Sequence, residues 1–347
     1  MSIKNTGTIS KLNKDRQAQT VSLNTDITEL AALPGLQPYL RYLIFSPHED
    51  ITNGFLRGKK ISELAEIGWS PEAIVTGLNE FLRAIAEGRV DLHRVYSEAE
   101  WADDELKRHV NLIRISPVNP DKAKPYIVLC AGGGYQNVCT VVEALPTARH
   151  MVDAGYTVFL MTYRVSVPGA AIAALDDLAQ AFHWLEEHAA EMNIDPARCA
   201  IGGYSAGGNL IANWGCANIG WKHYGAPKPL CLFPIYALID INARAAQSER
   251  AGILVTMLGD KWREKLDQYS IPDHIDKDYP PCYIVCGKDD AAVPCVNSEM
   301  LKQRLDSAGI PSVLEEGGHA RHGFGDGTGT DVEGWPERAL KFLENFC

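Results

Sequence analysis

The chain has 347 residues, of which 46% are hydrophobic and 22% charged, so it can bury a large core. Its net charge of −11 argues against nucleic acid and against anionic membrane surfaces as partners. The N-terminus lacks an apolar signal core and no run approaches membrane-spanning length, so a reducing cytoplasm is the expected compartment. The nine cysteines include no C-x-x-C pair, which suggests neither a zinc site nor a disulfide framework. Buried thiols are expected in the apolar runs, at Cys130, Cys231, Cys282 and Cys286.

The N-terminal part divides into two segments. Residues 1–25 are polar and are expected to form a loose arm. Residues 26–107 show a helical pattern and no obvious strand, and the clearest helix begins at Ser70-Pro71-Glu72, which offers an N-cap and a proline in the first turn. Apolar side chains then recur on one face until Gly88. We expect a small helical region that packs against the main domain, with coverage of a site or of a neighbouring subunit as the alternatives.

From residue 108 to the C-terminus, short apolar strands alternate with helix-length segments. Strands are expected at 110–115, 126–130, 157–163, directly before Ser205, 230–236, 282–286 and 312–315, and helices at 171–190 and 297–308. This rhythm predicts an α/β domain with a mostly parallel sheet covered by helices on both faces. The interval 237–280 is too long for a simple crossover and is expected to carry helices above the strand ends, where a lid would sit.

A glycine-flanked serine lies between the strand before it and a helix-like stretch after it. The segment Gly203-Tyr204-Ser205-Ala206-Gly207 fits the G-x-S-x-G pattern of a nucleophile elbow. The glycines give the clearance that a sharp strand-to-helix turn needs, and the following helix N-terminus adds partial positive charge. A plain glycine-rich turn is the alternative, since the pattern alone is common. The partners described next favour a nucleophilic Ser205.

Three glycines follow the expected strand at 126–130. In Gly132-Gly133-Gly134, backbone N–H groups can converge on a negative oxygen without side chains in the way. Together with the N–H of Ala206 they could form an oxyanion hole. A phosphate-binding loop is the rival interpretation, but the trailing Lys-Ser/Thr of that motif is absent. A flexible turn remains the other alternative.

Two later loops supply an acid and a base in the chain order Ser…Asp…His. The loop 287–294 contains Asp289 and Asp290, either of which could orient a histidine and stabilise its cation. The loop 317–325 contains His319 and His322, and a histidine serves as base and acid near neutral pH. The residues alone leave both choices open.

The order of these motifs resembles the α/β-hydrolase superfamily, and more narrowly the esterase/lipase group related to hormone-sensitive lipase and bacterial acetyl esterases. The resemblance covers residue 108 to the C-terminus and rests on AGGGY, TYR at 162–164, GYSAGGNL, GKDDAAVP and HGFG. It implies an α/β-hydrolase fold with Ser205 as nucleophile. It implies Asp290 as the acid, because the family acid stands four residues before the proline, and His322 as the base, because the family histidine opens the H-G-F run.

The resemblance also assigns the oxyanion hole. It implies backbone donors at Gly133, Gly134 and Ala206. Many relatives have a histidine where this chain has Ala131, and that residue usually supports the loop. Acyl hydrolases of this group often carry N-terminal cap helices.

The expected function is that of a serine carboxylesterase for small or medium acyl esters, working through an acyl-enzyme. An amidase or peptidase on the same triad is the alternative among enzymes, and a catalytically silent small-molecule-binding protein is the alternative from another class. No cofactor and no metal is expected, since no H-E-x-x-H or comparable ligand cluster occurs. The expected partner is a small-molecule ester, and assembly into a homo-oligomer is left open.

Overall fold

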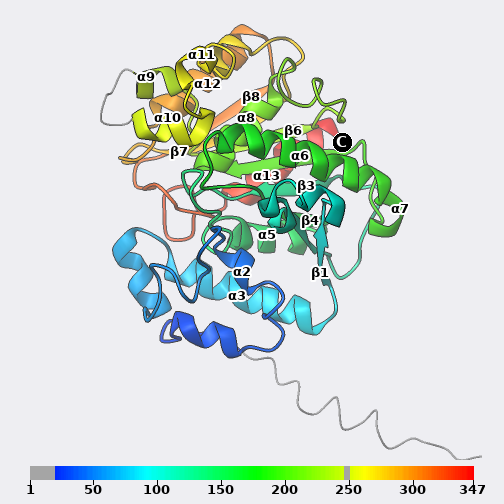
Figure 1. Ribbon diagram of the computed structural model, residues 1–347, viewed down its shortest axis with the longest axis vertical. Helices are drawn as coiled ribbons and strands as arrows, with labels where there is room; N and C mark the ends of the chain where they lie inside the picture. Colours follow the sequence, from blue (N-terminus) through cyan, green and yellow to red (C-terminus); the bar gives the residue numbers. More distant parts are fainter. Residues whose placement is uncertain (1–19, 246–250) are drawn as a thin grey trace, which may run out of the picture.

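The computed structural model describes residues 20–245 and 251–347, so residues 1–19 of the expected polar arm lie outside the described residues. Within the described ranges the centre of the molecule is an eight-stranded sheet in the order β1-β2-β4-β3-β5-β6-β7-β8 (Figure 1). Neighbouring strands pair in parallel from β4 across to β8, whereas β2 pairs antiparallel with both β1 and β4. The strands are β1 (Val90–Arg94), β2 (Asn111–Ile115), β3 (Tyr126–Cys130), β4 (Val158–Thr162), β5 (Cys199–Tyr204), β6 (Cys231–Ile235), β7 (Cys282–Gly287) and β8 (Ser312–Gly317).

The central strands are apolar along their whole length because helices cover both faces of the sheet. Every residue of β3, β4, β5, β6 and β7 is buried. Helices α5 (Ala144–Asp153) and α13 (Trp335–Leu343) pack together on one face, and α6 (Ala170–Glu187) and α8 (Ser205–Gly215) on the other (Figure 1). Helix α12 (Val296–Ser307) packs against β7 and β8. The mostly parallel, helix-covered sheet predicted from residue 108 onward is confirmed.

The N-terminal helices pack against the core. Ser70 caps α3 (Pro71–Ala86) by accepting the Ala73 N–H at 3.3 Å, as its sequence predicts. Helix α3 lies along α5, and the approach is close because a Cβ on Gly77 would stand 3.1 Å from the Pro146 backbone. The remaining short elements are η1 (Ile27–Ala32), α2 (Leu40–Leu43), η2 (Ile61–Ile67), α4 (Glu98–Trp101), η3 (Glu105–His109), α7 (Ala189–Met192) and η6 (Glu344–Phe346).

One strand lies where the sequence shows no strand signal. Val90–Arg94 forms β1, the antiparallel edge strand, inside the segment 26–107 that was expected to be helical. Its residues V-D-L-H-R are mixed in polarity because an edge strand is only partly covered. The same segment is tied to the main domain by polar contacts. Arg164 pairs with buried Asp177 and with Asp104 at 2.8 Å, and the Tyr96 hydroxyl donates to Asp177 at 2.9 Å.

The segment 237–280 carries short helices. They are α9 (Ile241–Ala245), α10 (Ala251–Leu258), α11 (Trp262–Lys265) and η5 (Ile271–Asp273), and residues 246–250 lie outside the described residues. Helix α10 packs against α6, and Figure 1 shows these helices at the end of the molecule opposite to the N-terminal helices. In the described ranges, no helix is both long enough and apolar enough to cross a membrane.

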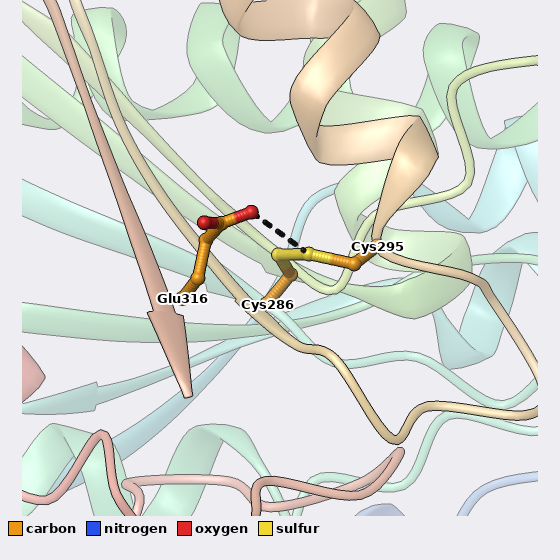
Figure 2. A group of neighbouring side chains, drawn as sticks. All are labelled: Cys286, Cys295 and Glu316. Carbon is orange, nitrogen blue, oxygen red and sulfur yellow. Dashed lines mark hydrogen bonds between the residues drawn. A yellow bond between two sulfur atoms is a disulfide. The ribbon is translucent and has the colours of Figure 1, made fainter. Parts of the chain in front are cut away.

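The expectation of a buried thiol is wrong for Cys286. This residue forms a disulfide with Cys295, because the loop after β7 turns back and brings the two Cα atoms to 5.7 Å. Figure 2 shows the pair beside Glu316 of β8, whose Oε1 lies 3.6 Å from the Cys295 sulfur. The other three cysteines, Cys130, Cys231 and Cys282, are buried free thiols, as expected.

Candidate active site

Ser205 stands on a strained turn between β5 and α8. Its φ is +50°, in the left-handed region that a residue with a Cβ rarely adopts. The turn is possible because its flanking glycines meet backbone directly. A Cβ on Gly203 would lie 2.3 Å from the Gly207 oxygen, and a Cβ on Gly207 would lie 2.0 Å from the Cys130 oxygen. The serine is therefore held at the carboxyl edge of the sheet, next to the loop that follows β3.

A hydrogen-bonded line joins three of the predicted residues. The Ser205 Oγ is 2.9 Å from His322 Nε2, and His322 Nδ1 is 2.7 Å from Asp290 Oδ2. The other Asp290 oxygen accepts the backbone N–H groups of Ala292 and Val293, each at 2.8 Å. Asp290 is buried, so the carboxylate is fixed by its own loop and has one oxygen left for the histidine.

The two competing candidates lie outside this line. Asp289 is exposed and accepts the Ala320 N–H at 2.9 Å, a contact that joins the loop 287–294 to the loop 317–325. His319 is also exposed, and its backbone N–H donates to Asp331. The geometry thus brings Asp290 and His322 to Ser205 and leaves their neighbours at the surface.

The expected oxyanion-hole residues border the same cavity as Ser205. Gly133 and Gly134 have φ values of +132° and +64°, conformations that favour glycine, and both line the cavity together with Ala206. Across the residues that the structure describes, the N–H groups of Gly133 and Gly134 donate to no protein acceptor. Ala206 lies in the first turn of α8, where N–H groups have no partner within the helix. These donors are free to bind a negative oxygen.

The cavity beside Ser205 has a volume of about 320 Å³ and mostly apolar walls. Leu238 follows β6, and Ile253 and Met257 come from α10 in the insertion. Val293 belongs to the loop after β7. Trp69, directly before α3, adds an indole that packs against Gly323. The N-terminal region therefore contributes to the cavity wall as well as packing on the core.

Sequence reasoning missed Glu143, which is buried at 4% exposure and lines the cavity with Ser205 and His322. One carboxylate oxygen accepts the Gly132 N–H, and the other accepts the Tyr236 hydroxyl at 3.0 Å. Burial raises the pKa of Glu143 to about 7, while the hydrogen bond from Gly132 and the nearby His322 oppose that rise. A lone acid within the apolar run 141–145 was the only sequence signal for this residue.

The described residues offer one cluster of groups that could ligate a metal ion, Cys286, Cys295 and Glu316. Its two sulfurs are bonded to each other (Figure 2), so neither is available as a thiolate ligand in this state. None of the three lines the cavity. The disulfide instead closes the loop that carries Asp290.

Comparison with known proteins gives a family match. A family model described as BD-FAE matches residues 115–305, a range that includes Ser205 and Asp290 and stops before His322. The chain is 27% identical over 214 residues to an acetylxylan esterase of Xylanibacter ruminicola, covering 61% of this chain and 43% of that protein. It is 33% identical over 124 residues to the carboxylic ester hydrolase LipN of Mycobacterium tuberculosis, covering 35% of this chain and 33% of LipN.

Solved structures agree in fold. An acetyl ester-xyloside bifunctional hydrolase from Caldicellulosiruptor lactoaceticus superimposes with a TM-score of 0.62 at 22% identity, covering 74% of this chain and 96% of that one. The matched region spans about a third to two fifths of the length of the curated relatives. The predicted α/β-hydrolase fold is thus confirmed.

Proposed function

The chain belongs to the BD-FAE family, within the esterase/lipase-like α/β hydrolases, and we propose that it is a serine carboxylesterase acting on small or medium acyl esters. The observation that carries the proposal is the hydrogen-bonded line from Ser205 through His322 to Asp290, which opens into a largely apolar cavity. The relatives are named as an acetylxylan esterase and a carboxylic ester hydrolase, and these activities support the same reaction class.

In this proposal Ser205 Oγ attacks the carbonyl carbon of the ester while His322 Nε2 takes its proton. Asp290 accepts the Nδ1–H and stabilises the imidazolium that forms. The N–H groups of Gly133, Gly134 and Ala206 bind the developing oxyanion. His322 then returns the proton to the departing alcohol, which leaves an acyl-enzyme on the serine. Water activated by the same histidine releases the acid and restores the serine hydroxyl.

The size of the acyl group follows from the cavity walls. Leu238, Met257 and Val293 are buried apolar side chains beside Ser205, and they suit an alkyl chain. A cavity of about 320 Å³ falls at the lower end of the usual range for ligand pockets of ~300–1,000 Å³. We therefore propose that short acyl esters are hydrolysed well and long-chain esters poorly.

Replacing Ser205 by alanine tests the proposal. The substitution removes only the attacking oxygen, and loss of a triad member costs up to roughly a million-fold in rate. A fluorophosphonate should label the wild type and not Ser205→Ala, and p-nitrophenyl acetate hydrolysis should disappear with it. Ser298→Ala is the matched control, because Ser298 is a buried serine away from the cavity and should keep both properties. Substantial turnover by Ser205→Ala would contradict the assignment, and a faster anilide than ester substrate would indicate an amidase.

We also propose a cytoplasmic location, since six of the seven free cysteines are buried thiols of the kind found in reducing compartments. In that compartment the Cys286–Cys295 pair is expected to be reduced, because cytosolic disulfides are rare. Because both cysteines are buried, the protein would be denatured in the alkylating reagent, without reductant, as the cells are lysed. Modified thiols at both positions are expected, and an unmodified pair would argue for an oxidising compartment.

A further inference from the structure

Glu143 is a buried carboxyl group that the serine, histidine and aspartate chemistry does not use. It stands at the N-cap position of α5 and lies 4% exposed in the wall of the cavity. Buried carboxyl groups are costly unless every oxygen has a partner, and here both oxygens have one. One partner, Gly132, belongs to the loop of the proposed oxyanion hole, and the other, Tyr236, contacts the proposed base His322.

The first partner is the backbone of the oxyanion loop, residues 131–134. Glu143 Oε2 accepts the N–H of Gly132, the residue directly before the two proposed oxyanion donors. The Tyr163 hydroxyl donates to the Ala131 carbonyl at 2.6 Å, and the Cys139 N–H donates to the Gly132 carbonyl at 2.9 Å. With these groups held, the next two N–H groups of the loop stay free of protein acceptors, within the part of the chain described. Two side chains from outside the loop, Glu143 and Tyr163, therefore support it.

The second partner leads to the histidine. Glu143 Oε1 accepts the hydroxyl of Tyr236, and the Tyr236 ring meets the His322 ring edge-on with centroids 4.9 Å apart. Tyr236 has a φ of +38°, so its position after β6 is fixed at a conformational cost. One carboxyl group thus braces the glycine loop and, through an aromatic ring, the imidazole.

The charges around Glu143 single out His322. Five titratable groups interact with its carboxyl from the surrounding elements, namely Cys139, Tyr163, Tyr204, Tyr236 and His322. Burial raises the pKa of the cysteine and of the three tyrosines above their ordinary values, so these four are neutral at neutral pH. The histidine is the one member of this group that can become a cation. A charged Glu143 favours that cation.

We propose that Glu143 is a positioning residue that holds the oxyanion loop through Gly132 and stabilises the imidazolium of His322. The inference rests on the proposed esterase function and deepens it. When His322 takes the proton of Ser205, the negative carboxylate nearby lowers the energy of the ion pair that forms. Activity then needs a neutral His322 and an ionised Glu143 together.

The experiment compares Glu143→Gln and Glu143→Ala with the wild type on p-nitrophenyl acetate between pH 5 and pH 9. The alanine variant loses the loop contact, and we expect kcat to fall about 100-fold with little change in KM, the scale seen when an oxyanion donor is lost. The glutamine variant keeps an amide oxygen for the Gly132 N–H. It loses the charge, and its NH2 group cannot accept the Tyr236 hydroxyl, which must accept a hydrogen bond instead. Since the loop contact is kept, we expect a smaller fall of about tenfold. Glu66→Gln is the control, since it neutralises an exposed carboxyl group outside the cavity and should leave kcat unchanged.

The pH profile separates this role from a structural one. Below neutral pH, log(kcat/KM) of the wild type should fall with a slope steeper than one proton, because two groups must be in the correct state. The slope of Glu143→Gln should return to one proton. Equal slopes, or a loss in both variants that appears only in thermal stability or KM, would overturn the inference. A wild type that neither hydrolyses the ester nor reacts with a fluorophosphonate would refute the esterase proposal instead, so the two failures are distinguishable.

Discussion

Replacing Glu143 by glutamine should remove a loss of stability that the wild type undergoes as the pH rises, even though the substitution lowers the proposed activity. The wild-type carboxyl group is 4% exposed, and burial raises its pKa from 4.5 to about 7. In the unfolded chain the same group loses its proton near pH 4.5. Between these two values the unfolded state binds fewer protons than the folded state, so stability falls as the pH rises. Glutamine has no proton to lose and escapes this fall.

The size of the effect follows from the two pKa values. They differ by about 2.5, and each pKa unit corresponds to about 1.4 kcal/mol, so the folded wild type loses about 3 kcal/mol across this window. The whole contribution is present below pH 4.5 and is lost once the pH passes about 7. Any fixed difference in packing between the two side chains adds equally at every pH and cancels in the comparison.

Urea unfolding of the two proteins at pH 5 and pH 8 measures this change, with fluorescence and circular dichroism followed together to test for a single transition. The free energy of unfolding of Glu143→Gln minus that of the wild type should rise by about 3 kcal/mol from the lower to the higher pH. Glu66→Gln is the control, since Glu66 is exposed and its substitution should give no pH-dependent difference. A constant difference at the two pH values, or a wild type that gains on the variant at pH 8, would refute the reasoning.

Three further outcomes are expected. His322→Ala should reduce kcat/KM by several orders of magnitude, whereas His319→Ala should leave it within a few-fold, because only the former reaches Ser205. Asp290→Asn should reduce kcat/KM far more than Asp289→Asn, since only the buried Asp290 carboxylate contacts the histidine. Comparable losses of kcat/KM within either pair, measured on folded protein, would contradict the assignment of that residue. Met257→Ala enlarges the cavity and should raise the ratio of kcat/KM for an octanoyl ester to kcat/KM for an acetyl ester by roughly tenfold. An unchanged ratio would indicate that the acyl group does not bind beside Met257.

Local patterns were enough to predict the main sheet. Tyr126–Cys130 was predicted with its observed bounds, and the strand before Ser205 was placed correctly, because a central parallel strand is apolar throughout and ends at a glycine-rich loop. The edge strand Val90–Arg94 was missed for the opposite reason. It pairs with β2 alone and is only partly buried, so its polarity is mixed and its place in the sheet is decided by tertiary contacts.

The candidate site divides in the same way. Ser205 could be recognised from its glycines, because the turn constrains the residues next to it in sequence. Glu143 could not, because its partners stand 11 and 93 residues away and nothing in the adjacent sequence reports them. Trp69 lies beside the helix-start signal at Ser70, which predicts local structure and does not indicate the cavity that this side chain lines. The Cys286–Cys295 pair likewise depends on how the intervening loop folds back.

The support of the oxyanion loop connects these observations. Ala131 is buried and has no polar side chain with which to hold the glycines that follow it, so this loop takes its support from Glu143 and Tyr163. The carboxylate of Glu143 has a second effect that matters for the proposed reaction, because it favours positive charge on His322. The same burial that strengthens this effect makes the charged carboxyl unfavourable for folding. The rate advantage proposed for Glu143 and its stability cost therefore have one physical origin, the buried negative charge. The glutamine variant, which lacks this charge, should lose both.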